Sequence, residues 1–393
     1  MEHILETPRQ VPVYGKYDTV VVGGGFAGVA AALAAAREGN KVLLCEREFM
    51  LGGLGTAGLV TIYLPLCDGM GHQVSYGIAE ELLKLSISRG WEARYPTAWL
   101  ENGTFEEKCA TRYQVRYNAQ VCAVLYEQKL LEDGVEILYG ALVCGAEVSD
   151  GRITHLLIET KGGRSAIEVG NVIDCSGDAD ICALAGEDTA TFGPGLVSSG
   201  WYYFMNEGKY DLQMVGVDCT KPERCVGLRR YNGIEAKDVS DFVIESHENM
   251  IKHFFAGGDV SPEHMLVTMA SIPQIRMTRR LASGFELDLS DDGKEFADSV
   301  GLFSNWRTRG PVYEVPYGIL HGRKIKNLGT AGRCISVTDA MWDISRVIPV
   351  CAVTGEAIGV AAAMARDFDA VDVPALQQKL RDKGLLLHKK EAM

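Results

Sequence analysis

The sequence lacks the features of several protein classes. No run of lysine or arginine occurs in its 393 residues, and a formal net charge of −13 makes it a poor ligand for nucleic acids or anionic membranes. Residues 1–18 do not combine a basic segment with an apolar stretch, which predicts no signal peptide. The longest apolar stretches, 19–36 and 347–365, are interrupted by glycine and favour buried elements over a membrane span. We therefore expect a cytoplasmic protein without nucleic-acid or membrane partners.

Paired cysteines and metal-binding motifs are also missing. The eleven cysteines are odd in number, scattered, and form no CxxC pair, which argues against a disulfide framework, a zinc ribbon or a dithiol redox centre. HExxH, GxSxG and Cys/His ligand spacing do not occur, so no metal is predicted. Glycine, in contrast, is abundant at 44 residues, which is typical of tight turns and close backbone approaches to a ligand.

The chain opens with a predicted strand–helix–strand unit. Residues 17–22 are an apolar run typical of a parallel strand that is buried on both faces. A glycine turn and an alanine-rich helix follow, and we expect Gly39 and Asn40 to end that helix. Residues 41–45 are predicted as the next strand. The unit has the length of a β-α-β motif.

The turn after the first strand carries a GxGxxG fingerprint. Its glycines permit a tight turn, a close approach of a pyrophosphate and close packing of helix on strand. The helix N-terminus presents free N–H groups to the phosphates, and a carboxylate at the end of the second strand accepts the ribose hydroxyls. Together these features predict a dinucleotide site, the alternative being a chance glycine-rich turn. The residues assigned to it are Gly23, Gly25, Phe26, Ala27, Gly28, Glu46 and Arg47.

Three further segments decide between FAD and NAD, which the fingerprint does not distinguish. LGGLGT at 51–56 follows the acidic strand end, VIDCSGDAD at 172–180 runs from a strand into a glycine turn, and LGTAGR at 328–333 is a second such turn. An extended FAD needs a second glycine turn for its ribityl and flavin parts, which favours FAD. The expected contacts from these segments are Gly53, Leu54, Thr56, Cys175, Ser176, Gly177, Asp178, Gly332 and Arg333.

At these residues the chain resembles a known family, the bacterial FAD-dependent oxidoreductases within the glutathione-reductase-like flavoproteins. The matching segments read GGGFAG, LGGLGT, IDCSGDAD, AGRCIS and TGEAIGVAAA, with QIRMTRRLASGF and EVPYGIL between them. The departures are Cys175-Ser176 in place of Ala-Thr, and Met277 inside the arginine element. The resemblance implies an oxidoreductase with FAD as its cofactor. We expect non-covalent binding, because no histidine or cysteine stands in an attachment motif.

The expected fold is α/β: a Rossmann-like, glutathione-reductase-like FAD-binding domain with an inserted α+β substrate domain. Helices are predicted at 77–89, at 118–133 with Asn118 as cap, and at 240–255, 354–366 and 373–383. Strands are predicted at 135–138, 142–148, 153–160 and 171–175, with a hairpin turn at 149–152 and a polar loop at 288–293. The predicted segments are 1–85, 116–188 and 319–393 for the FAD-binding domain, 86–115 for an insertion toward the substrate side, and 189–318 for the substrate domain.

Two more cofactor contacts are predicted from position. A helix beginning at Thr354 and Gly355 would aim its N-terminus at the flavin pyrimidine edge, with Gly355 and Ala357 in contact, and stabilise negative charge there. The alternative is a buried alanine-rich helix without that role. Val143 and Cys144 are candidates for backbone contact with adenine, although a simple core strand explains them nearly as well.

The candidate catalytic residues are Arg276, Arg346, Tyr317 and His72. Arginines near a flavin bind a substrate carboxylate or stabilise the anionic flavin, whereas in an acidic protein they also serve as structural ion pairs. Tyr317 could donate a proton or line the pocket, and its alternative is a packed tyrosine with a satisfied hydroxyl. His72 lies in the loop LCDGMGHQ, which either faces the flavin or is an ordinary flexible loop.

The function favoured by these features is a dehydrogenase or reductase that moves a hydride between flavin N5 and a small polar metabolite. A non-catalytic flavin-binding or electron-transfer subunit is the first alternative, and a flavin monooxygenase or halogenase the second. The electron donor or acceptor, the direction of the reaction and a homo-oligomeric assembly are left open by the sequence.

Overall fold

The computed structural model, which describes residue 4 and residues 7–393, is built on one seven-stranded sheet. Its strands are β1 (Val13–Val22), β2 (Val42–Glu46), β5 (Glu136–Tyr139), β6 (Leu142–Ser149), β7 (Arg152–Thr160), β8 (Gly163–Asp174) and β16 (Leu328–Thr330). The order is β5-β2-β1-β8-β7-β6, and β16 also pairs with β8. β5, β2, β1, β8 and β16 pair in parallel, while β6 and β7 are antiparallel additions. The predicted α/β class with a Rossmann-like core is confirmed.

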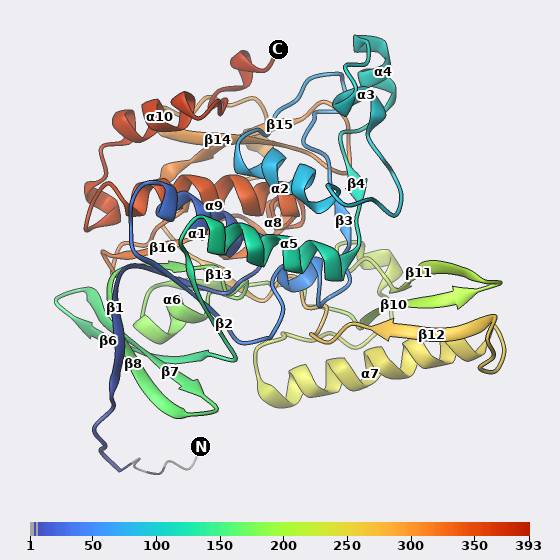
Figure 1. Cartoon of the computed structure of the whole chain (residues 1–393), viewed down its shortest axis with the longest axis horizontal. Coiled ribbons are helices and arrows are strands. Elements are labelled where there is room, and N and C mark those ends of the chain that lie inside the picture. Colours follow the sequence, from blue (N-terminus) through green and yellow to red (C-terminus); the bar gives the residue numbers. More distant parts are fainter. Residues whose placement is uncertain (1–3, 5–6) are drawn as a thin grey trace.

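Helices cover both faces of this sheet (Figure 1). On one face lie α1 (Phe26–Arg37) and α9 (Ile348–Ala362), which pack closely because glycines of α9 meet the backbone of α1. A Cβ on Gly355 would stand 2.4 Å from the carbonyl oxygen of Ala27, so no side chain fits there. The short helix α6 (Asp180–Ala185) packs on the other face, where Ile181 joins the second apolar cluster.

The remaining helices surround this core. Four of them are α2 (Ile78–Ser86), α5 (Ala119–Glu132), α8 (Asp339–Ser345) and α10 (Val373–Asp382), and two short ones are α3 (Thr97–Leu100) and α4 (Phe105–Ala110). Two-stranded sheets form from β3 (Ile62–Tyr63) with β4 (Val115–Arg116), β9 (Thr189–Thr191) with β13 (Arg279–Leu281), and β14 (Ser299–Ser304) with β15 (Val312–Pro316).

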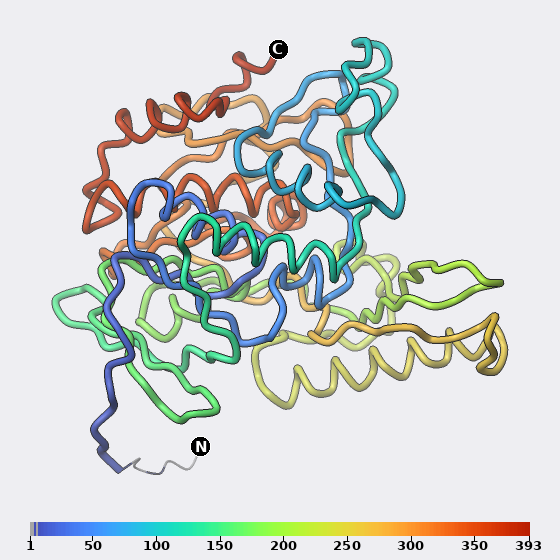
Figure 2. Tube along the Cα trace, viewed as in Figure 1, coloured from blue at the N-terminus to red at the C-terminus, as the bar shows by residue number. Residues whose placement is uncertain are grey.

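Between β9 and β13 the chain leaves the central layer and builds an arm (Figure 2). The arm consists of β10 (Ser199–Asn206), β11 (Lys209–Gly216) and β12 (His264–Met269), with the long helix α7 (Ala236–Phe255) along one face of that sheet. Tyr202 and Phe204 of β10 pack against Met250 and Phe254 of α7. The arm lies within the predicted substrate segment 189–318, whose boundaries stay a prediction.

Most predicted elements appear, with shifted ends. Asn118 caps α5 by accepting a hydrogen bond from the Val121 N–H at 3.1 Å, as expected from its position. The hairpin turn is present, with Asp150 at φ 51° and Gly151 at φ 73°. α7 begins at Ala236 rather than at residue 240, β8 starts at Gly163 rather than at 171, and the loop 288–293 contains a short helical turn, Leu289–Asp291. α9 is the largest departure, because it begins at Ile348 rather than at Thr354.

Three findings bear on partners and metals. Within the described residues, no single helix is long and apolar enough to cross a membrane, although α8 and α9, bent by 92° at their junction, pass that test as a pair. The eleven cysteines are all free thiols. In the described part of the chain no group of three or more His, Cys, Asp or Glu side chains is placed to hold a metal.

Candidate functional site

A cavity opens at the carboxyl ends of β1, β2 and β8. These strands are parallel, so their ends meet at one edge of the sheet, where doubly wound folds bind ligands. Segments far apart in the sequence line the cavity together: the glycine turn before α1, residues 45–48 and 52–55, residues 141–143, the turn after β8, and residues 331–351 in part. On the side of the arm, α7 contributes Val239, and the segments that precede α7 and follow β12 contribute Gly233, Ile234, Ile272, Pro273 and Ile275.

The glycine turn before α1 is shaped by backbone crowding. Gly23 has φ 99°, and a Cβ there would stand 2.5 Å from the carbonyl oxygen of Cys175. A Cβ on Gly28 would stand 1.8 Å from the carbonyl oxygen of Gly23, whereas a Cβ on Gly25 would meet nothing within 4 Å. Gly25 is therefore the glycine that leaves open space in the cavity. α1 begins directly after it with no side-chain cap, so its first N–H groups are available to an anion.

Glu46, the last residue of β2, holds the glycine turn before α1 from the other side. Its carboxylate accepts hydrogen bonds from the Gly24 N–H at 2.6 Å and from the Glu48 N–H at 2.8 Å. Burial raises the pKa of this carboxyl, and the two backbone donors oppose that shift. Glu46 and Arg47 both line the cavity, next to residues 141–143. An adenosine ribose placed here would find a buried acceptor that is already held in position.

The turn after β8 is held by a buried carboxylate and a buried thiol. Asp174 accepts hydrogen bonds from the N–H groups of Ser176, Ile181 and Cys182 at 2.9–3.0 Å. The Cys334 sulfur accepts from the Gly177 N–H at 3.2 Å and from the Ala179 N–H at 3.3 Å. Residues distant in the sequence thereby fix the backbone that lines the cavity.

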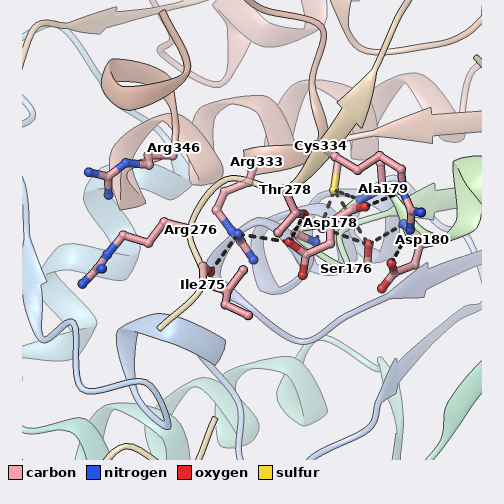
Figure 3. A network of polar contacts seen from close by, with 12 residues as sticks. Ser176, Asp178, Ala179, Asp180, Ile275, Arg276, Thr278, Arg333, Cys334 and Arg346 are labelled. Atoms are coloured by element: carbon pink, nitrogen blue, oxygen red, sulfur yellow. Dashed lines mark hydrogen bonds and ion pairs between the residues drawn. The ribbon is translucent and has the colours of Figure 1, made fainter. Parts of the chain in front are cut away.

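Arg333 lies over this turn (Figure 3). Its guanidinium donates to the Ile275 carbonyl at 3.1 Å and approaches the Asp178 carboxylate at 3.4 Å. A Cβ on Gly177 would stand 2.1 Å from the guanidinium, so this glycine is required for the approach. Thr278 also donates to Asp178, at 2.6 Å. The arginine thus joins the turn of β8 to the chain that leads into β13.

Asp180 and Arg279 form a second pair beside this network, at 2.8 Å. Burial and the neighbouring Asp178 raise the pKa of Asp180 to about 6, against the lowering effect of Arg279. Both residues line the cavity, so charged groups of either sign face the space where a diphosphate or ribityl chain would lie.

The structure brings most of the predicted site residues to this one cavity. Those that line it are Gly23, Gly25, Phe26, Ala27, Glu46, Arg47, Gly53, Leu54, Val143, Cys175, Ser176, Gly177, Asp178, Arg333 and Arg346. Predicted residues that do not line it are Gly28, Thr56, Gly332, Gly355, Ala357, Arg276, Tyr317 and His72.

Three of the outlying glycine-motif residues shape the cavity from behind. Gly28 allows α1 to approach the first turn, as described above. Thr56 is fully buried and donates its hydroxyl to the Leu51 carbonyl, which folds the 51–56 loop on itself. Gly332 has φ 68°, and its N–H donates to the Thr354 hydroxyl at 2.9 Å.

The predicted role of Gly355 and Ala357 is wrong in position. Because α9 begins at Ile348, both residues lie inside the helix and are buried, with Gly355 against α1. The first turn of α9 instead brings Ile348 and Cys351 to the cavity. The N-terminus of α9 does reach the cavity, at Ile348 and Cys351, but the helix begins several residues earlier than predicted.

Three of the four candidate catalytic residues, Arg276, Tyr317 and His72, do not line the cavity. The Tyr317 hydroxyl donates to the Phe368 carbonyl at 2.8 Å, and the side chain is buried, which matches the alternative of a packed tyrosine. His72 pairs with Asp68 at 2.9 Å in a loop whose ends, Cys67 and Gln73, are joined by an isolated antiparallel β-bridge of the backbone. Among the described residues neither side chain reaches the cavity.

The sequence reasoning missed several lining residues. Arg279 belonged to the recognised basic cluster with Arg276 and Arg280 but was not chosen as a site residue, and Asp180 ended a recognised motif. Ile348 and Cys351 were missed because the start of α9 was misplaced, although Pro349 in its first turn is typical of a helix start. Gly233 and Ile234 carry no local pattern that points to a ligand.

These observations define a class. The cavity combines an uncapped helix N-terminus, an open glycine, a buried acceptor for a ribose and a second glycine turn beneath an arginine, which fits an extended dinucleotide such as FAD. The fold and site are those of a flavoprotein that binds its dinucleotide between two glycine turns.

The chain belongs to the FAD dependent oxidoreductase family, which matches residues 18–195 and 198–380. FAD is therefore its cofactor, and the protein is an FAD-dependent oxidoreductase. Thioredoxin reductase of Ureaplasma parvum serovar 3 is 36% identical over 77 residues, covering 20% of this chain and 25% of the relative. Glutathione reductase of Debaryomyces hansenii is 33% identical over 132 residues, covering 32% and 24%. The matches thus span about a quarter of each relative. A geranylgeranyl bacteriochlorophyll reductase-like protein of Thermoplasma acidophilum has 14% identity and a TM-score of 0.47, covering 94% of this chain and 83% of that one.

The purified protein is expected to be yellow and to release FAD, not FMN, on denaturation. FMN has no adenosine and would leave the Glu46 end of the cavity empty. Chromatography of the supernatant after heat or acid denaturation identifies the cofactor. Release of FMN, or flavin that stays on the precipitated protein, would contradict the assignment of a non-covalent FAD site.

Glu46→Ala is expected to weaken FAD binding by roughly 1–3 kcal/mol, the range for leaving buried polar partners unpaired. The Gly24 and Glu48 N–H groups lose their acceptor together with the ribose. Titration of the apoprotein with FAD measures the change, and Glu46→Gln, which keeps an acceptor oxygen, serves as the matched control. Equal affinity of the alanine variant and the parent protein would remove Glu46 from the site.

Proposed function

We propose that this FAD-dependent oxidoreductase is a dehydrogenase or reductase that moves a hydride between flavin N5 and a carbon of a small polar metabolite. The supporting observation is the composition of the cavity wall. Residues of the arm side, among them Ile234, Pro273 and Ile275, line the same cavity as the cofactor turns. An inserted segment that closes over a cofactor cavity is what a substrate chamber requires.

The bound flavin supplies two-electron chemistry, and the residues of this chain bind, orient and enclose the substrate. The apolar side chains that line the cavity on the side of the arm would keep water from the space next to the first turn of α9, where Ile348 and Cys351 lie. A hydride would pass between the substrate carbon and the flavin, and the accompanying proton would pass to or from solvent. A separate electron donor or acceptor would return the flavin to its starting state.

Anaerobic titration of the holoprotein against a panel of metabolites tests this proposal. Loss of the oxidised-flavin absorbance with one metabolite, and recovery of the oxidised spectrum with the matching oxidised product, supports it. Reduction only by NADPH or NADH, followed by oxygen-dependent hydroxylation of an added substrate, would favour a monooxygenase instead. A flavin that responds to neither treatment would favour a non-catalytic or electron-transfer role.

A further inference from the structure

Arg276 is a cation without a carboxylate partner. It lies in the chain between β12 and β13, and within the described part of the protein no carboxylate stands within ion-pair distance of it. Its Nη1 donates only to neutral acceptors, the Gln274 carbonyl at 3.3 Å and the Ser199 hydroxyl at 3.5 Å. The guanidinium stands over the Trp201 ring, 5.2 Å from the centroid, and among the described residues its Nε and Nη2 groups have no hydrogen-bond acceptor.

The neighbouring arginines, in contrast, are already neutralised. Arg346 donates to one oxygen of Asp343 at 2.7 Å, and Arg307 binds the other oxygen of the same carboxylate. Arg307 also pairs with Asp218 at 2.9 Å. Two arginines and two aspartates therefore cancel, Arg333 pairs with Asp178, and the cluster is left with one uncompensated positive charge.

That charge is unfavourable while it has no partner. Burial, with repulsion from Arg346 as the next cause, lowers the pKa of Arg276 to about 9. An arginine held beside other cations without a counter-ion costs stability, and a bound anion would remove that cost. Figure 3 shows Arg276 and Arg346 projecting to the same side. Arg276 does not itself line the cofactor cavity, but its chain neighbour Ile275 and Arg346 do.

We propose that Arg276 anchors a single carboxylate of the substrate, and that the substrate is accordingly a monoanionic organic acid rather than a neutral molecule or a dicarboxylate. This inference rests on the proposed function, which makes the bound acid the substrate of the enzyme. The guanidinium offers a planar pair of donors to the carboxylate, while Asp343 keeps Arg346 from attracting a second one.

Binding, and not turnover, tests the inference. Benzoate and acetate, their neutral amides benzamide and acetamide, and the dianions phthalate and succinate are titrated into the FAD-loaded protein, with the visible flavin spectrum as readout. We expect the monocarboxylates to bind at least tenfold more tightly than the amides and the dianions. Equal binding of acid and amide, or tighter binding of the dianions, would overturn the proposal, as would no binding of any acid.

Variants locate the charge that does the binding. Arg276→Met is expected to abolish the preference for acid over amide, and Arg276→Lys to restore little of it, because a point charge does not reproduce the fork. Arg230→Met is the matched control: it removes an arginine that, among the described residues, is bonded only to the Gly195 and Cys219 carbonyls, and it should leave the preference unchanged. An unchanged preference in Arg276→Met, with or without a shifted flavin potential, would overturn the proposal.

Asp343→Asn provides a second, opposite test that does not remove Arg276. It frees Arg346, whereas Arg307 keeps its pair with Asp218. We expect the preference to move from benzoate and acetate toward phthalate and succinate. Flavin content and the thermal melt confirm that each variant is folded. If the acid preference follows Arg276 but no metabolite reduces the flavin, the proposed function fails and the anion site stands. If a neutral metabolite reduces the flavin and no acid binds, the anion site at Arg276 fails and the proposed function stands.

Discussion

Gly25→Ala is expected to leave the protein folded and to remove most of its affinity for FAD. Gly25 has φ −67° and ψ 179°, a conformation that alanine adopts without strain, and a Cβ there would meet no protein atom within 4 Å. The methyl group would project into the open space beside the N-terminus of α1, where the pyrophosphate must approach the backbone. Flavin content after purification and an FAD titration measure the loss.

Gly28→Ala is the matched control variant, in which the added methyl group is expected to disturb the fold itself. Its Cβ would stand 1.8 Å from the Gly23 carbonyl oxygen, so α1 and the turn must separate before any cofactor binds. We expect a lower melting temperature even for apoprotein, because over-packing costs roughly 1–3 kcal/mol and this clash is with backbone. If Gly25→Ala binds FAD normally, or Gly28→Ala melts like the parent apoprotein, the reading of the two glycines is wrong.

Much of the cofactor site was predictable because its signals are local. A strand followed by GGGFAG, a carboxylate at the next strand end and a second glycine turn each occupy a few consecutive residues, and the parallel sheet brings strand ends to one edge. Even Asn118, the cap of α5, is a local signal.

The remainder depended on contacts between distant segments. Tyr317 is paired with the carbonyl of Phe368, which no local pattern indicates. Whether Arg276 or Arg346 carries a free charge depends on Asp343, Arg307 and Asp218, three residues from different parts of the chain. The start of α9 was missed because Val347-Ile348-Pro349-Val350 is rich in β-branched residues, which favour strands, although Pro349 suits the first turn of a helix.

The second large effect is expected at Glu356, which is buried inside α9 and has no part in the proposed chemistry. Its carboxylate accepts a hydrogen bond from the Ile78 N–H at 2.7 Å, at the start of α2. The charged groups around it are Arg37 of α1, Glu81 of α2 and Lys383 after α10. Burial raises the pKa of Glu356 to about 7, and the backbone donor and the two cations only partly oppose that shift.

The sign of the pH effect follows from proton binding. Unfolded glutamate titrates near its ordinary value of 4.5, so between about 4.5 and 7 the folded protein binds more protons at this site than the unfolded chain. The unfolding free energy contributed by Glu356 therefore falls as the pH rises through this window, and stays low above it. A shift of this size corresponds to a loss on the order of 3 kcal/mol.

Glu356→Gln should remove this loss, because a glutamine keeps an acceptor for the Ile78 N–H and carries no charge into the core. At pH 8 we expect the variant to be more stable than the parent protein by up to the order of 3 kcal/mol, and at pH 5 the two should nearly coincide. Urea denaturation of both proteins across this range gives the difference, in which contributions from all other titrating groups cancel. The exposed Glu248→Gln on α7 is the control and should show no pH-dependent difference. A Glu356→Gln difference that is constant from pH 5 to 8 would mean that Glu356 remains ionised in the folded protein throughout, held by Arg37, Lys383 and the start of α2 more strongly than burial opposes it.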